Sequence, residues 1–272
     1  MNMKYSNIIL FSDLDGTLLN SQMQVSEENR KAIKDFVSQG GRFGVATGRG
    51  FKSAMVYLEG LPFNYYSIFL NGAMLYDMRS NEKVECDFLD KEQVIPLARR
   101  SLEKYPNLGI SIYMENDAYF VSPKETTPHG VVQVHLDHGF IDIDELQDRK
   151  WLKVLFHGQS QELKLVEEDS RYLVEAGVVN GIYTTNYYYE LLPKDCNKGR
   201  MISRIHQHKN KQDIVYAVGD FYNDVEMIAQ ADVGIYTENA PEELKKRGKW
   251  VCAECNESAI ADVIYRIIDG NL

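Results

Sequence analysis

Two aspartates separated by one residue follow a short apolar run near the start of the chain. Asp13 and Asp15 lie in the segment DLDGT (residues 13–17), directly after the apolar residues 8–11. Carboxylates at the end of a buried strand do not belong to a solvated face, and Gly16 allows a sharp turn with space for a ligand near the backbone. A carboxylate whose charge is screened by a cation can attack phosphorus and form an acyl phosphate. The segment therefore indicates nucleophilic chemistry on a phosphoryl group.

Three further polar clusters lie at or near the ends of other predicted elements. TGR (residues 47–49) and GDFYND (residues 219–224) each follow an apolar run, and NKG (residues 197–199) opens a helical pattern. Ligands of an open parallel sheet bind beyond the carboxyl ends of its strands, so we expect these clusters to converge. Asp13 and Asp220 would then bring like charges together, which is costly without a cation. Oxygen-only ligands of this kind favour Mg²⁺.

The elements that must position these residues alternate between strand and helix at both ends of the chain. Apolar runs at residues 8–11, 43–46, 66–70, 214–218 and 233–235 are typical of strands buried on both faces. Ser26 can cap a helix that Gly40 and Gly41 stop, and an apolar stripe from Ile260 to Ile268 predicts a last helix that Gly270 ends. This alternation predicts an α/β fold with a parallel sheet.

The middle of the chain has a different pattern. Strand-like runs at 110–113 and 119–121 flank a turn, 151–156 is another strand candidate, and 182–184 with 188–192 resembles a second antiparallel pair. Helical stretches at 93–104 and 161–168 lie between them. We therefore expect an α+β domain, residues 83–191, inserted into a core formed by residues 1–82 and 192–272.

Composition limits the partners. The chain has 272 residues and a formal net charge of −10, and an acidic surface does not favour nucleic acid or an anionic membrane. No apolar run approaches the roughly 18 residues that span a bilayer. The N-terminal residues lack a signal-peptide cleavage site. We expect a cytoplasmic chain with no obligatory protein partner, in which Cys252 and Cys255 are reduced thiols because no second pair completes a zinc site.

The four clusters, in this order and at these separations, resemble the signature motifs of the haloacid dehalogenase superfamily. The large insert between the second and third motifs resembles the α/β cap of its Cof-type branch, subfamily IIB, which contains sugar phosphatases. The stretches TGRGF, LNGA, ELLPKDCNKG and NAPEELK resemble that branch too. The resemblance implies a Rossmann-like core with an inserted α+β cap, and it is weak within the cap.

The resemblance also implies roles for single residues. Asp13 matches the nucleophile, and Asp15 the acid/base whose backbone carbonyl also binds the metal. Lys198 matches the lysine that neutralises the phosphoryl group. The metal set is then Asp13, Asp15 and Asp220. The remaining matches are Thr47, Gly48, Arg49 and Asn223 for phosphate binding, with Asp224 and Asn71 in support. Two simpler interpretations stay open. Arg49 could form an ion pair with an acid without contacting substrate, and Asn71 could form a turn without taking part in the site.

The function that these residues indicate is a magnesium-dependent phosphatase acting on a small phosphomonoester, such as a sugar phosphate. Asp15 favours hydrolysis, because related ion-pumping ATPases lack an acid at that place and hold the acyl phosphate longer. The alternatives are a phosphotransferase such as a sugar phosphomutase, or a non-catalytic phosphate-binding regulator. The substrate itself is not determined by the sequence; His129 and the tyrosines 187–189 are candidate specificity residues in the insert.

Overall fold

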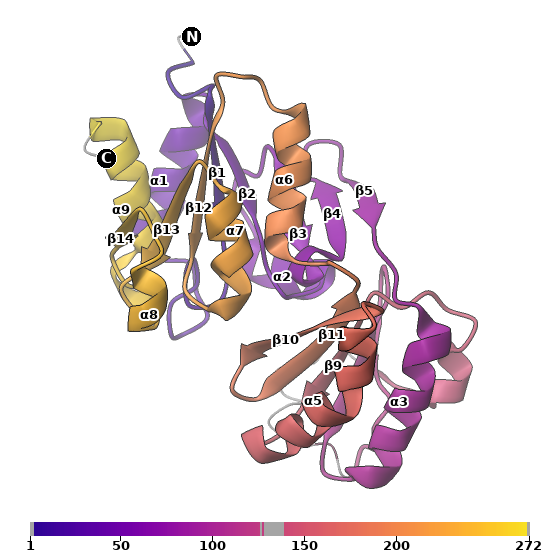
Figure 1. The fold of residues 1–272 in the computed structure, drawn as a ribbon. Helices are drawn as coiled ribbons and strands as arrows, with labels where there is room; N and C mark the ends of the chain where they lie inside the picture. The colour runs from indigo at the N-terminus through magenta and orange to yellow at the C-terminus, as the bar shows by residue number, and fades with distance from the viewer. Residues whose placement is uncertain (1–2, 126, 128–138, 271–272) are drawn as a thin grey trace. The chain divides into compact units, whose positions relative to one another are not determined.

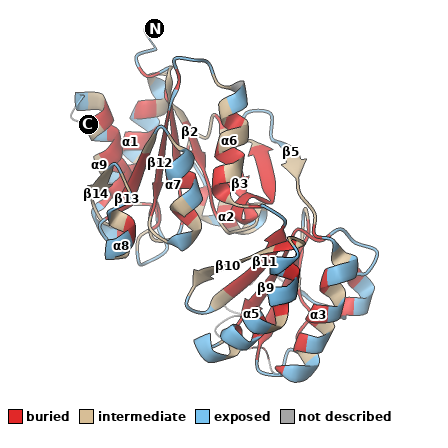
Figure 2. Ribbon diagram, viewed as in Figure 1, coloured by how far each residue is buried: buried red, intermediate tan, exposed pale blue. Residues whose placement is uncertain are grey.

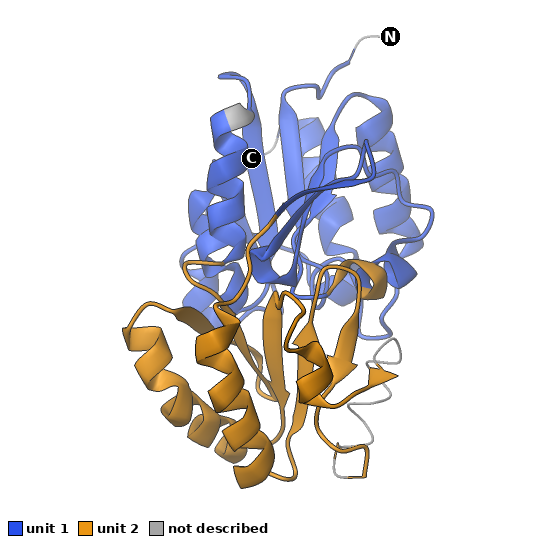
Figure 3. Cartoon of the chain, turned by 90° about the vertical axis from the view of Figure 1, so that its right-hand side faces the viewer, with its two compact units in different colours: residues 1–49, 54–85, 197–272 blue, residues 50–53, 86–196 orange. Residues whose placement is uncertain are grey.

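The computed structural model describes residues 3–125, 127 and 139–270 (Figure 1). Buried residues concentrate in the strands and on one side of most helices (Figure 2). The chain divides into two compact units (Figure 3): Met1–Arg49, Ala54–Glu85 and Asn197–Leu272 form the first, and Gly50–Ser53 with Cys86–Cys196 form the second. The candidate specificity residue His129 lies outside the described residues.

The first unit is built on a parallel sheet with the strand order β14-β13-β12-β1-β2 (Figure 1). Its strands are β1 (Ile8–Ser12), β2 (Arg42–Val45), β12 (Ile214–Gly219), β13 (Val233–Thr237) and β14 (Trp250–Cys252). β1 lies between β12 and β2, and its residues are almost completely buried because helix side chains also pack against it. The expected α/β class is confirmed, and the sequence correctly indicated every one of these strands except β14.

Helices flank this sheet. The α-helices outside the inserted segment are α1 (Glu27–Ser38), α2 (Phe51–Leu58), α6 (Lys198–His208), α7 (Val225–Gln230), α8 (Glu242–Lys245) and α9 (Ala259–Asp269). Apolar residues of α6 and α7 pack on side chains of β1 and β12, while α1 lies beside α9 (Figure 1). Ser26 caps α1 as predicted, because its Oγ accepts the backbone N–H of Asn29 at 3.1 Å. Gly270, with φ +69°, ends α9.

The pairing of the third predicted strand differs from the expectation. β3 (Tyr66–Phe69) pairs antiparallel with β4 (Met74–Asp77), in a separate sheet of order β3-β4-β5 that ends with β5 (Glu82–Cys86). It touches β2 through one parallel bridge between Ala46 and Ile68. The reason is that side-chain oxygens of Asn64 and Ser67 accept the N–H groups of Phe43 and Val45. Those donors of β2 are therefore not available to carbonyls of β3.

The second unit contains a mixed sheet of order β10-β11-β9-β6-β7-β8. Its strands are β6 (Gly109–Tyr113), β7 (Ala118–Phe120), β8 (Gly139–Phe140), β9 (Lys153–His157), β10 (Val179–Thr185) and β11 (Tyr188–Pro193). The predicted antiparallel pairs β6–β7 and β10–β11 are confirmed. Its described residues include the helices α3 (Lys91–Lys104) and α5 (Ser160–Glu175), of which α5 is longer than predicted.

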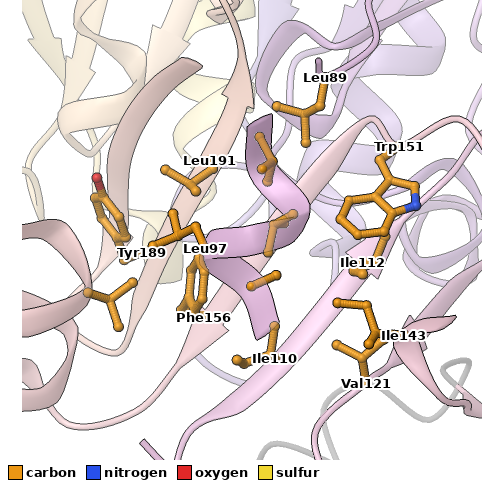
Figure 4. Packing of buried hydrophobic residues seen from close by; sticks show 14 of the residues in the cluster. Leu89, Leu97, Ile110, Ile112, Val121, Ile143, Trp151, Phe156, Tyr189 and Leu191 are labelled. Atoms are coloured by element: carbon orange, nitrogen blue, oxygen red, sulfur yellow. The ribbon is translucent and has the colours of Figure 1, made fainter. Parts of the chain in front are cut away.

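One face of this sheet packs against the helices. Trp151, Phe156 and Leu97 lie in this core (Figure 4), and the Trp151 indole N–H donates to the carbonyl of Leu146 at 3.0 Å. Among the three tyrosines, Tyr189 is buried in the same core, whereas Tyr187 is exposed. Short 3-10 turns complete the chain: η1 (Leu70–Gly72), η2 (Ile143–Leu146), η3 (Tyr222–Asp224) and η4 (Cys255–Glu257). Within the described residues, none of the helices combines the length and the apolar character needed to cross a membrane.

Candidate active site

Asp13 and Lys198 meet in the interior of the first unit. Asp13 follows β1, and its backbone N–H donates to Val218 at 2.8 Å, which continues the pairing with β12. Lys198 is the first residue of α6, whose N-cap Asn197 accepts the N–H of Arg200. The Lys198 Nζ donates to Asp13 Oδ1 at 2.6 Å, and both side chains are buried. Residues 185 positions apart in the chain thus form a charge-assisted pair.

Asp224 holds this arrangement together. Its Oδ1 accepts a second hydrogen bond from Lys198 Nζ at 2.6 Å. Its Oδ2 accepts the backbone N–H groups of Asp220 and Phe221 at 3.0 and 3.1 Å. Asp224 therefore fixes both the lysine and the loop that follows β12.

The charges in this cluster do not balance. Burial raises the pKa of Asp13 well above 3.8, and the carboxylates of Asp224, Asp220 and Asp15 raise it further against the opposing effect of Lys198. Burial and Asp224 raise the pKa of Asp220 to about 7. Burial alone would lower the pKa of Lys198, but Asp13 and Asp224 outweigh it and raise that pKa. An excess of buried negative charge is therefore left for a cation to neutralise.

Hydrogen bonding indicates which carboxylates could hold that cation. Oxygens of Asp13, Asp220 and Asp224 lie within 4.8 Å of one another. Both oxygens of Asp224 already accept hydrogen bonds from Lys198 and two backbone groups, so Asp13 and Asp220 are the better ligands. Hard oxygen donors in a site with excess negative charge fit Mg²⁺.

Gly16 allows the approach between the DLDGT loop and Asp220. Its φ is +78°, and a Cβ at this position would lie 2.4 Å from Asp220 Oδ2. A larger residue would therefore displace the carboxylate as well as strain the turn. Thr17, next in the loop, donates its hydroxyl to Asp220 Oδ1 at 3.3 Å.

Asp15 lies at the edge of the cluster and pairs with Arg49. Arg49 Nε and an Nη donate to the two carboxylate oxygens at 2.8 and 2.7 Å. The Asp15 side chain is 46% exposed, whereas that of Arg49 is only 14% exposed. The Arg49 guanidinium also lies 4.7 Å from the ring centre of Tyr57. Arg49 does pair with an acid, and that acid is the expected acid/base.

Asn71 connects the TGR loop with the loop after β12. Its backbone N–H donates to the Thr47 carbonyl at 3.0 Å, and its Oδ1 accepts from Asn223 Nδ2 at 3.1 Å. A Cβ on Gly48 would lie 2.8 Å from Asn71 Nδ2, so Gly48 leaves just enough room for this side chain. Leu70 and Asn71 both have φ +52°, a strained conformation for residues with a Cβ. Asn71 is thus a buried link between two loops and not only a turn.

Comparison with known proteins identifies the family. A family model described as haloacid dehalogenase-like hydrolase matches residues 10–264. The chain belongs to this family. The family predicted from the four motifs is therefore confirmed, and the protein is a hydrolase of the haloacid dehalogenase-like class.

Three similar proteins illustrate the relationship. The HMP-PP phosphatase of Serratia proteamaculans is 28% identical over 92% of this hydrolase and 91% of that protein. A haloacid dehalogenase-like hydrolase from Bacteroides thetaiotaomicron has a crystal structure that matches with a TM-score of 0.83 and 26% identity, covering 97% of this chain and all of that chain. The chloroplastic endoribonuclease YBEY of Arabidopsis thaliana is 25% identical over 94% of this chain, which spans only about half of that protein (46%).

Sequence reasoning assigned no role to two residues of this hydrolase that touch Asp220. Thr17 belongs to the DLDGT segment, so its place was visible although its bond was not. Asn239 lies beyond β13 and approaches Asp220 Oδ2 at 3.4 Å. Its segment NAPEELK resembles the Cof-type branch, but the resemblance does not assign a role to Asn239.

Proposed function

We propose that this hydrolase is a magnesium-dependent phosphatase that hydrolyses a small organic phosphomonoester through an aspartyl phosphate on Asp13. The observation that carries the proposal is the buried Asp13 carboxylate, held 2.6 Å from Lys198 Nζ beside Asp220 in a cluster with excess negative charge. Asp13, Asp220 and the backbone carbonyl of Asp15 are the proposed metal ligands. When bound, Mg²⁺ would neutralise the carboxylates and polarise a phosphoryl oxygen.

The proposed reaction has two displacements at phosphorus. In the first, a carboxylate oxygen of Asp13 forms a bond to phosphorus while the bond to the leaving oxygen breaks, and Asp15 gives that oxygen a proton. In the second, the Asp15 carboxylate takes a proton from water as the water oxygen attacks phosphorus. The bond to Asp13 then breaks and inorganic phosphate leaves.

Other residues of the site would stabilise the phosphoryl group during these displacements. Lys198 carries the positive charge closest to the Asp13 oxygen, at 2.6 Å. Thr47, Gly48 and Asn223 are the proposed hydrogen-bond donors to the phosphoryl oxygens, and the Asn71 side chain accepts a hydrogen bond from Asn223 Nδ2. Arg49 is the proposed second cation, provided that the substrate phosphate competes with Asp15 for its guanidinium. Charge stabilisation of this kind is the main protein contribution to phosphoryl transfer.

The substrate class belongs to the same proposal. A relative named HMP-PP phosphatase, 28% identical, supports a small phosphorylated molecule. We propose that residues 83–191 act as the cap that sets the choice of substrate, and that the enzyme acts in the cytoplasm.

Two variants test the mechanism with p-nitrophenyl phosphate as substrate. Asp13→Asn should reduce turnover to background, because an amide cannot form the acyl phosphate. Asp15→Asn should still be phosphorylated, since p-nitrophenol leaves without a proton, but should lose base catalysis of about 10²–10⁴-fold in the water step. Rapid quenching should therefore show a burst of product and a phosphate on Asp13 by mass spectrometry. Asp35→Asn, an exposed aspartate on α1, is the matched control.

The same assay separates the alternatives. Excess chelator should abolish turnover, and full activity with chelator would remove the metal from the proposal. Phosphate recovered on an added sugar and not as free phosphate would identify a phosphotransferase. A phosphate on a residue other than Asp13, or an active Asp13→Asn, would overturn the mechanism.

A further inference from the structure

The side-chain amide of Asn239 joins three separate segments of the first unit. Its Nδ2 donates to the backbone carbonyl of Gly16 at 2.9 Å and approaches Asp220 Oδ2 at 3.4 Å. Its Oδ1 accepts the backbone N–H of Cys255 at 3.0 Å. The amide thus connects the DLDGT loop, the carboxylate after β12 and the turn η4.

The backbone around Asn239 explains how the side chain reaches these partners. β13 ends at Thr237, whose carbonyl accepts the N–H of Ala240 at 3.1 Å. This bond closes a four-residue turn in which Asn239 occupies the third position. Since parallel strands end at the same edge of the sheet, the turn after β13 lies beside the loops after β1 and β12.

The three partners allow only one orientation of the amide. Two acceptors, the Gly16 carbonyl and the Asp220 carboxylate, lie on the NH₂ side, and one donor, the Cys255 N–H, lies on the oxygen side. A flipped amide would place oxygen against two oxygens and NH₂ against N–H. Asn239 is an exposed residue, yet both its side-chain nitrogen and its side-chain oxygen form hydrogen bonds with protein groups.

These contacts affect two proposed metal ligands, the Asp220 carboxylate and the backbone carbonyl of Asp15. Asp220 receives one hydrogen bond from Thr17 on Oδ1 and the Asn239 contact on Oδ2, which together define the rotation of the carboxylate. The same amide holds the Gly16 carbonyl, one residue beyond the Asp15 carbonyl that we propose as a ligand. Partners that orient metal ligands in this way influence affinity without binding the metal.

We propose that Asn239 is a positioning residue that sets the Mg²⁺ affinity of this hydrolase by clamping Asp220 and the Gly16 carbonyl together. The inference rests on the magnesium site of the proposed function. It predicts that Asn239 acts on metal binding and has no direct part in the bond-making steps. Its loss should therefore be offset by raising the magnesium concentration.

The test measures magnesium binding on the full chain without substrate, by isothermal titration calorimetry after chelator treatment. Asn239→Ala should weaken the Mg²⁺ dissociation constant about tenfold, the lower end of the range for such partners. Asn239→Ser, which keeps a small polar side chain but lacks the amide, should change it in the same direction. The kcat of both variants should return to within about twofold of the unaltered enzyme at saturating magnesium, because the reacting groups are intact.

Asn256→Ala is the matched control. Asn256 Oδ1 accepts the backbone N–H of Ser21 at 3.0 Å, so this asparagine also bonds η4 to the segment after the DLDGT loop. Within the part of the chain that the structure describes, it forms no hydrogen bond with Asp220 or Gly16. Its variant should bind magnesium normally, with circular dichroism showing that all the variants are folded.

Each outcome decides the proposal. Normal binding by Asn239→Ala, or equal weakening in Asn256→Ala, would overturn it, the second by showing that any loosening of η4 suffices. An unaltered chain that binds no magnesium would remove this inference together with the metal of the proposed function. Normal magnesium binding without any phosphatase activity would refute the proposed function and leave the role of Asn239 standing.

Discussion

Replacing Asp220 with asparagine should make the metal-free protein more stable at pH 8, although it removes a proposed metal ligand. The cause is the unbalanced charge around Asp13. Burial and the Asp224 carboxylate raise the pKa of Asp220 from 3.8 to about 7, so its ionised form is destabilised in the folded chain. An asparagine has nearly the same shape and carries no charge. Its carbonyl can still accept the hydrogen bond from Thr17, and it loses only the 3.4 Å contact with Asn239 Nδ2.

The size of the effect follows from the pKa. The rise from 3.8 to about 7 corresponds to at most about 4 kcal/mol, at about 1.4 kcal/mol per unit. We expect about 2 kcal/mol, because Asp13 shares the repulsion and is relieved together with Asp220. The folded pKa lies above the unfolded value, so the unaltered chain loses stability as the pH rises from about 4 to 7. The advantage of Asp220→Asn should grow over that range and stay constant above it.

Thermal melting in excess chelator at pH 5 and pH 8 measures this difference. At pH 8 the Tm of Asp220→Asn should exceed that of the unaltered protein by about 4–8 °C, with a smaller gain at pH 5. Added magnesium should raise the Tm of the unaltered protein and leave the variant unchanged.

Asp213 is the control, because its replacement by asparagine should change the stability in the opposite direction. The pKa of Asp213 is lowered: burial opposes this, but hydrogen bonds from Arg42 and from the Asn210 backbone outweigh it. Asp213→Asn should therefore be less stable than the unaltered chain at pH 8. If Asp220→Asn melts at or below the unaltered protein at pH 8 in chelator, the electrostatic account of the cluster is wrong.

Two more predictions concern the loops that would bind phosphate. Asn71→Gly and Asn71→Ala should lose turnover alike, since both remove the oxygen that accepts from Asn223. In urea denaturation, Asn71→Ala should be about 1 kcal/mol less stable than Asn71→Gly, because alanine keeps a Cβ in the left-handed region. Equal stabilities of the two variants would contradict this. Arg49→Ala should raise KM several-fold while changing the free energy of unfolding by less than about 1 kcal/mol. Arg79→Ala is the control, because it also removes a bidentate ion pair, with Asp77, and it should leave KM unchanged. The same KM for both variants would exclude Arg49 from the phosphate site.

The fold was predictable where burial on both sides of the sheet leaves a continuous apolar run. β1 and β12 have such runs, and their pairing follows from the alternation of strands and helices. β14 is an apolar run of only three residues, too short to indicate a strand, and β5 is largely exposed and has no continuous apolar run. The pairing of β3 was not predictable, because it depends on Asn64 and Ser67 taking the N–H groups of β2 through their side chains.

The candidate site was predictable to the extent that residue type and position at a strand end carry information. Asp13, Lys198 and Asp220 were expected to converge, and the structure brings them together. That Arg49 pairs with an acid was one of two open interpretations, but the sequence did not indicate which acid, and the structure shows that it is Asp15. Asn239 lies in the stretch NAPEELK, but that resemblance gave it no role, because an asparagine in an exposed turn is common and its three partners meet only in the folded chain.

The central place of β1 in its sheet has a consequence for synthesis of the chain. β1 pairs with β2 soon after both emerge, but its other neighbour, β12, begins about 200 residues later. At about 5–20 residues per second, the ribosome leaves that edge of β1 unpaired for about 10–40 s. The contiguous residues 86–196 of the second unit emerge during this interval and can fold first. A permuted chain in which residues 197–272 precede residue 1 would bring β12 out shortly before β1, and the exposed apolar edge would close almost at once.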